Sequence, residues 1–84
     1  MSQHIDKHTE YLLAEARNAA RISDASMSYY LREAVKEFHQ WNAEPWLQFG
    51  NEGDKKYRYK RANKCIKRIV DLLDDLGWFD GGRC

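Results

Sequence analysis

Residues 26–42, "SMSYYLREAVKEFHQWN", carry the clearest helical pattern in the chain. Apolar side chains recur there at steps of three and four residues, a spacing that places them on one face of a helix. Pro45 follows shortly after, and proline disfavours helical geometry at the residue before it. The stretch therefore predicts an amphipathic helix over about 26–42. Its apolar face is formed by Met27, Tyr30, Leu31, Ala34, Phe38 and Trp41.

Two further segments show helical spacing, one on each side of this helix. The first covers about residues 4–22, and its small apolar residues would let a partner helix approach closely. Ser23 and Asp24 interrupt it and can cap the helix that follows, because short polar side chains satisfy free amides at a helix start. No stretch alternates like a half-buried strand. The apolar stripe of this first helix contains Ile5, Leu12, Ala16 and Ala19.

The third helix is predicted over about 55–76, with Asp54 as its N-cap and Gly77 in the position that follows a helix end. We expect residues 43–54 to form an aromatic loop before the third helix. After this helix, we expect the side chains of Trp78 and Phe79 to pack against the open end of the bundle and bury it. Together these patterns predict an all-α, three-helix domain spanning residues 1–84. The apolar face of the third helix contains Tyr59, Ala62, Cys65, Ile66, Ile69, Val70, Leu73 and Leu76.

Composition limits the class of protein. The chain has 84 residues, of which 43% are hydrophobic and 13% aromatic, and this is enough apolar area for one folded domain. The same composition argues against intrinsic disorder. We see no signal peptide and no apolar run of membrane-spanning length. Cys65 and Cys84 form no disulfide framework, and we expect Cys65 to be buried in the core. A cytoplasmic protein without a membrane partner is the resulting expectation.

Positive charge is concentrated in residues 55–68, "KKYRYKRANKCIKR", which hold eight of the fourteen Lys and Arg residues and no acid. Residues 1–54 carry five basic and nine acidic side chains, and the net charge of the chain is only +1. Like charges four residues apart weaken a helix, and so do cations near its N-terminal end. The simpler interpretation is a solvated helix face. However, a small domain that tolerates this loss of helix stability can recover the free energy in a complex, which favours an anionic partner. The predicted binding residues are Lys56, Tyr57, Lys60, Arg61, Lys64, Lys67 and Arg68.

Two functions fit this basic face. The first is a small non-enzymatic regulator or inhibitor that docks on an anionic surface of a larger protein or nucleoprotein assembly. The second is a nucleic-acid-binding module, in which Tyr57 on the outer side could stack on bases while Tyr59 stays in the core. Near-neutral net charge favours the first. Arg32, Lys36 and His39 could extend the face, and the oligomeric state stays open.

Catalytic and metal-binding patterns are weak, so we expect no enzyme activity and no cofactor. His4 and His8 are four residues apart, a spacing at which two imidazoles on a helix can bind the same metal, and Asp6 and Glu10 are possible oxygen ligands nearby. Zinc sites, however, ordinarily need three or four protein ligands, and no distant Cys/His pair completes this one. No activated nucleophile motif and no phosphate-binding glycine loop is present. The remaining cluster consists of surface acids near a helix end, namely Asp71, Asp74 and Asp75.

Overall fold

The computed structural model describes residues 6–43 and 52–79 of the chain. Over these residues it consists of three helices without any strand: α1 (Lys7–Ile22), α2 (Ala25–Trp41) and α4 (Glu52–Asp75). The all-α, three-helix prediction is confirmed. Most of the predicted aromatic loop, including Trp46, Leu47 and Phe49, lies outside the described residues, as do Ile5 and Cys84.

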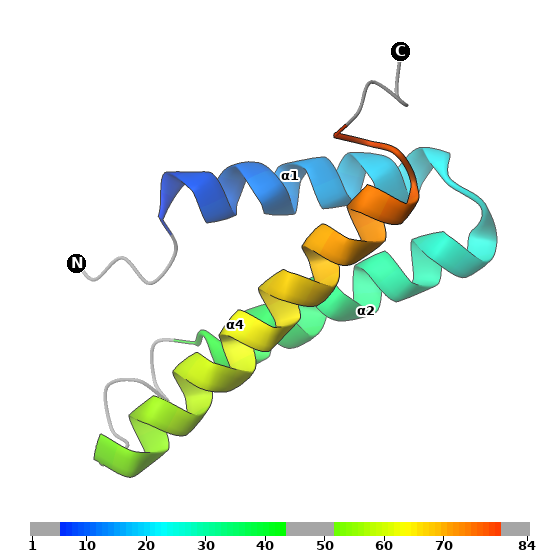
Figure 1. Cartoon of the computed structure of the whole chain (residues 1–84). Coiled ribbons are helices and arrows are strands. Elements are labelled where there is room, and N and C mark those ends of the chain that lie inside the picture. Colours follow the sequence, from blue (N-terminus) through cyan, green and yellow to red (C-terminus); the bar gives the residue numbers. More distant parts are fainter. Residues whose placement is uncertain (1–5, 44–51, 80–84) are drawn as a thin grey trace.

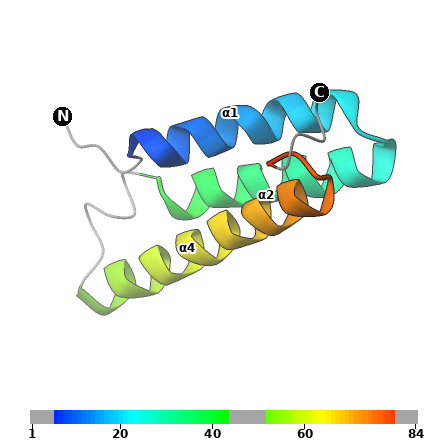
Figure 2. The ribbon, with the colours of Figure 1, turned by 45° about the horizontal axis from the view of Figure 1, so that its top comes forward.

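Helix α2 runs antiparallel to both other helices, and α4 crosses it obliquely, so that the C-terminal end of α4 also reaches α1 (Figures 1 and 2). The α1–α2 connection is short, and an aspartate caps the N-terminal end of each of these two helices. The Asp6 carboxylate accepts a hydrogen bond from the Thr9 amide at 2.7 Å, and the Asp24 carboxylate accepts one from the Met27 amide at 3.0 Å. The Ser28 hydroxyl donates to the Ala20 carbonyl. This bond ties the first turn of α2 to the last turn of α1.

Every helix contributes its periodic apolar face to one core. Phe38, Cys65 and Leu73 are buried, as the spacing predicted. Small residues of α1 bring it close to α2, which leaves little of either inner face exposed to solvent. The buried members of this core include Leu13, Ala16, Ala19, Leu31, Ala34, Phe38, Ala62, Cys65, Ile69 and Leu73.

The C-terminal end of α4 closes with a Schellman motif. The Gly77 amide donates to the Asp74 carbonyl at 2.9 Å, the Trp78 amide donates to the Leu73 carbonyl at 3.0 Å, and Gly77 has φ 70°. This geometry suits glycine, which has no Cβ to clash in the left-handed region. The turn directs Trp78 into the core, where its side chain is 9% exposed and its indole N–H donates to the Glu15 carboxylate of α1.

The prediction of burial in the core is wrong for three aromatic residues. Tyr30 is 55% exposed, Tyr59 is 48% exposed and Phe79 is 43% exposed. Helix α4 crosses the bundle obliquely, so its N-terminal half has α2 beside it but no α1 (Figure 1). Tyr59 lies in that half and therefore lacks a second neighbour. Tyr30 packs edge-on against Tyr29 with ring centroids 5.6 Å apart, and Phe79 follows the turn that buries Trp78.

The start of α4 also differs from the prediction. The helix begins at Glu52, so Asp54 lies in its first turn and is not the N-cap. Acidic residues in a first turn interact favourably with the helix dipole. Asp54 therefore offsets part of the cost that the following basic residues impose on this end of the helix.

Candidate binding surface

Four lysines form one exposed stripe along α4. Lys56, Lys60, Lys64 and Lys67 are spaced by three or four residues, and each is exposed. From the first to the last, the stripe extends about 16 Å along the helix axis at 1.5 Å per residue. Among the described residues, no carboxylate lies within ion-pair distance of any of these four ammonium groups. We call these four residues the lysine stripe.

The two arginines of the predicted binding face are placed differently, because both turn toward α2. The guanidinium of Arg61 lies 3.3 Å from Glu37 Oε2, and that of Arg68 lies 3.4 Å from Glu37 Oε1. Their side chains are 36% and 51% exposed, so neither ion pair is fully shielded from water. The basic run contains no acid of its own, and for these two arginines Glu37 supplies the compensating acid from another helix.

Trp41 completes this contact between α2 and α4. Its indole N–H donates to Glu37 Oε2 at 3.2 Å, and the guanidinium carbons of Arg58 and Arg61 lie 5.2 and 5.3 Å from its ring centroid. Both distances are within the range of a cation–π interaction. Tyr57 packs edge-on against the same ring, with centroids 5.6 Å apart, while half of its own surface stays exposed.

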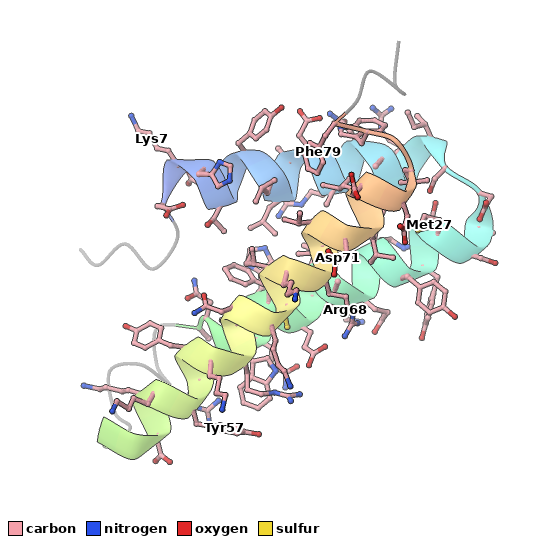
Figure 3. All side chains as sticks on the ribbon, viewed as in Figure 1. Lys7, Met27, Tyr57, Arg68, Asp71 and Phe79 are labelled. Atoms are coloured by element: carbon pink, nitrogen blue, oxygen red, sulfur yellow. The ribbon has the colours of Figure 1, made fainter. Side chains whose placement is uncertain are left out.

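Glu37 and its partners border an open pocket of about 380 Å³ beside α4. Arg68 and Asp71, one turn apart on α4, both line this pocket. Figure 3 labels the two side chains. Cys65 lies at the pocket wall and is buried. Burial raises the pKa of the Cys65 thiol, and the neighbouring Glu37 carboxylate raises it further, while Arg68 and Arg61 act in the opposite direction. A thiol in this state is a poor nucleophile at neutral pH.

Tyr59 belongs to the exposed surface next to the lysine stripe, although the sequence analysis assigned it to the core. It follows Lys56 by three residues, a spacing that makes the two residues neighbours on the helix surface, and it directly precedes Lys60. The signal that could have identified it is its position within the basic run "KKYRYKR", because Lys and Arg are mostly exposed and a run rich in them favours a solvent-facing segment. Asn63 is also exposed between the lysines and adds a neutral polar group.

The three residues of α2 that could extend the basic face do not form one continuation of the lysine stripe. They are Arg32, Lys36 and His39. Arg32 borders a groove on the α1 side of α2, and Lys36 lies on the outer ridge of α2 and borders hollows on both sides. His39 Nε2 lies 3.3 Å from Arg17 Nη2 of α1, and it accepts this hydrogen bond when the neutral ring carries its proton on Nδ1. Burial, and then the charge of Arg17, lower the pKa of His39.

The described residues contain no group of three or more side chains placed to hold a metal ion. His8 is exposed on α1, and Asp71, Asp74 and Asp75 are exposed on α4. His4 lies outside the described residues. Within residues 6–43 and 52–79, none of the helices combines the length and apolar character required to cross a bilayer. Comparisons with protein-family models, curated proteins and solved structures give no match for this chain.

Proposed function

We propose that this protein is a small non-enzymatic regulator or inhibitor that docks α4 on an anionic surface of a larger protein or nucleoprotein assembly. The observation that carries the proposal is the lysine stripe, whose four ammonium groups have no carboxylate partner among the described residues. Lysines that project in a row from a straight helix match an extended row of carboxylates. Tyr59 adds a large contact surface with a polar tip beside them.

The placement of the arginines favours a protein surface over nucleic acid. Arginine guanidinium planes stack on unpaired bases in addition to contacting phosphates, whereas lysine acts as a compact charge. Arg61 and Arg68 direct their guanidinium groups to Glu37, so the freely projecting cations of this face are lysines. A net charge of +1 also means that acids elsewhere on the chain would oppose a polyanion as long as a nucleic acid.

Binding to nucleic acid is the second candidate, and exposed Tyr59 is the observation that favours it. An aromatic ring between Lys56 and Lys60 could stack on a base while both lysines contact phosphates. Four phosphate contacts predict that the logarithm of affinity falls by roughly 3 to 4 per log unit of salt. The absence of nucleic-acid affinity at low salt in the purified wild type would reject this candidate.

The proposal is tested by affinity capture from the native cells with the wild-type protein and with a Lys60→Glu/Lys64→Glu/Lys67→Glu variant. These side chains are exposed, so the variant should keep its helical circular dichroism spectrum. We expect the wild type to retain a partner that the variant releases. A folded variant that retains every partner of the wild type would exclude a functional role for the lysine stripe.

The matched control adds negative charge away from α4. Lys7 and Ser26 are exposed at the starts of α1 and α2, and Lys7→Glu/Ser26→Glu changes the net charge in the same direction. We expect this control to retain the partner of the lysine stripe. Loss of the partner in both variants would assign the effect to net charge instead of the α4 surface.

A further inference from the structure

A second basic surface lies on the seam between α1 and α2. An open groove of about 280 Å³ follows this seam, and its floor is formed by Ala16, Ala20, Leu31 and Val35, which are at most 9% exposed. Helix α4 packs on the other side of α2, where Glu37 meets Arg61 and Arg68. Figure 2 shows α2 between α1 and α4. The groove is therefore separate from the lysine stripe.

Cations from both helices form the rim of this groove. Arg17 comes from α1, and Arg32 and Lys36 come from α2. An adjoining hollow of about 230 Å³ shares Arg17 and Arg32 and adds Arg21. The described residues that border these two hollows include no acid. The apolar floor is thus flanked on both sides by positive charge.

The arginines of this rim differ from those of α4 because no carboxylate neutralises them within the described part of the chain. Arg17 contacts the His39 ring, and Arg21 donates to the Asn18 side chain at 3.2 Å. Lys36 is the exception, since it lies 3.7 Å from Glu33. Three guanidinium groups therefore border the groove and its adjoining hollow without a compensating acid among the described residues, in contrast to Arg61 and Arg68.

We propose that this groove binds an acidic segment of a partner protein that inserts one large apolar side chain between flanking carboxylates. The aliphatic stems of Arg17, Arg32 and Lys36 over this floor supply the apolar contact, and the guanidinium groups supply the complementary charge. A volume of about 280 Å³ lies just below the range of about 300–1,000 Å³ typical of sites for drug-sized ligands, and it suits one leucine or phenylalanine side chain. A phosphate backbone offers no apolar group for the floor, which favours an acidic peptide over nucleic acid.

The test is a titration of ¹⁵N-labelled full-length protein with a peptide of about twelve residues, in which one Leu is flanked by Asp and Glu. We expect amide shifts to concentrate around Arg17, Ala20, Arg32 and Val35. Arg17→Gln/Arg32→Gln should weaken binding roughly tenfold, as expected for the loss of two charge pairs in a partly exposed setting. A peptide with Ala in place of its Leu should also bind more weakly.

Lys60→Gln/Lys64→Gln is the matched control, because it removes the same charge from the lysine stripe and should leave shifts in the groove unchanged. Shifts confined to α4, or no shifts at about 2 mM peptide, would overturn this proposal. The same holds if the Arg17→Gln/Arg32→Gln variant binds with unchanged affinity. Shifts at the groove that depend on protein concentration without peptide would assign it to a second copy of the chain, and would also overturn the proposal.

Discussion

Replacing Glu37 with Ala should destabilise the protein by about 1.5–2.5 kcal/mol, a large effect for one partly exposed side chain. The variant loses the two ion pairs with Arg61 and Arg68, each worth about 0.2–1 kcal/mol at this exposure. It also loses the hydrogen bond from the Trp41 indole, which contributes about 1 kcal/mol. Alanine has high helix propensity, so the backbone of α2 adds no penalty.

The assay is urea unfolding followed by circular dichroism, with thermal unfolding as a second measurement. For a domain of this size, the expected loss lowers Tm by roughly 8–15 °C. Glu37→Gln should cost about half as much, because its amide oxygen can still accept from Trp41. High salt should reduce the difference between wild type and Glu37→Ala, since the ion pairs are partly screened.

Glu33→Ala is the control for this experiment. Glu33 lies one turn earlier on α2, and its pair with Lys36 is exposed, so its replacement should cost less than about 0.5 kcal/mol. If Glu37→Ala and Glu33→Ala differ by less than about 0.5 kcal/mol, then Glu37 does not hold α2 and α4 together, and the reasoning fails.

Three other perturbations test the core and its titrating groups. Phe38→Ala should lower the free energy of unfolding by about 3–5 kcal/mol in a urea titration, because Phe38 is buried; a loss below about 1 kcal/mol would contradict its placement. In a Cys84→Ser variant, Cys65 should react slowly with a thiol reagent in the native state and rapidly in urea, whereas rapid native labelling would contradict its burial. Because folding lowers the pKa of His39, the unfolded chain binds its proton first as pH falls below about 6.5, so stability should fall with acidification. Unfolding curves of His39→Gln should show a shallower loss between pH 7 and 5, and an unchanged slope would refute this assignment.

The helices could be predicted from the sequence because each has a local cause. Periodic apolar residues such as Leu31, Phe38 and Leu73 determine which face is buried, and Gly77 determines where α4 ends. The errors arise where burial depends on how far a neighbouring helix extends. Tyr59 has the spacing of a core residue, but the oblique crossing of α4 leaves it without α1 as a neighbour (Figure 1).

The charged surfaces were harder to predict because their partners are distant in the chain. Glu37 pairs with arginines that are 24 and 31 residues away, so no local pattern relates them. The groove beside Arg17 and Arg32 exists only where α1 packs on α2, and its rim combines cations from both helices. The lysine stripe was predictable because its four members lie on one helix and need no partner to form a row.

The measurement that tests the central claim most directly is photocrosslinking from the middle of the lysine stripe. Asn63 is exposed and uncharged, so a photoreactive phenylalanine analogue at this position leaves all four lysines intact. Exposed Ser26, at the start of α2, is the control position. In native cells, irradiation should crosslink the Asn63 variant to a partner with an acidic surface and give little product from the Ser26 variant. Crosslinks from Ser26 with none from Asn63 would contradict the claim that α4 docks on the partner.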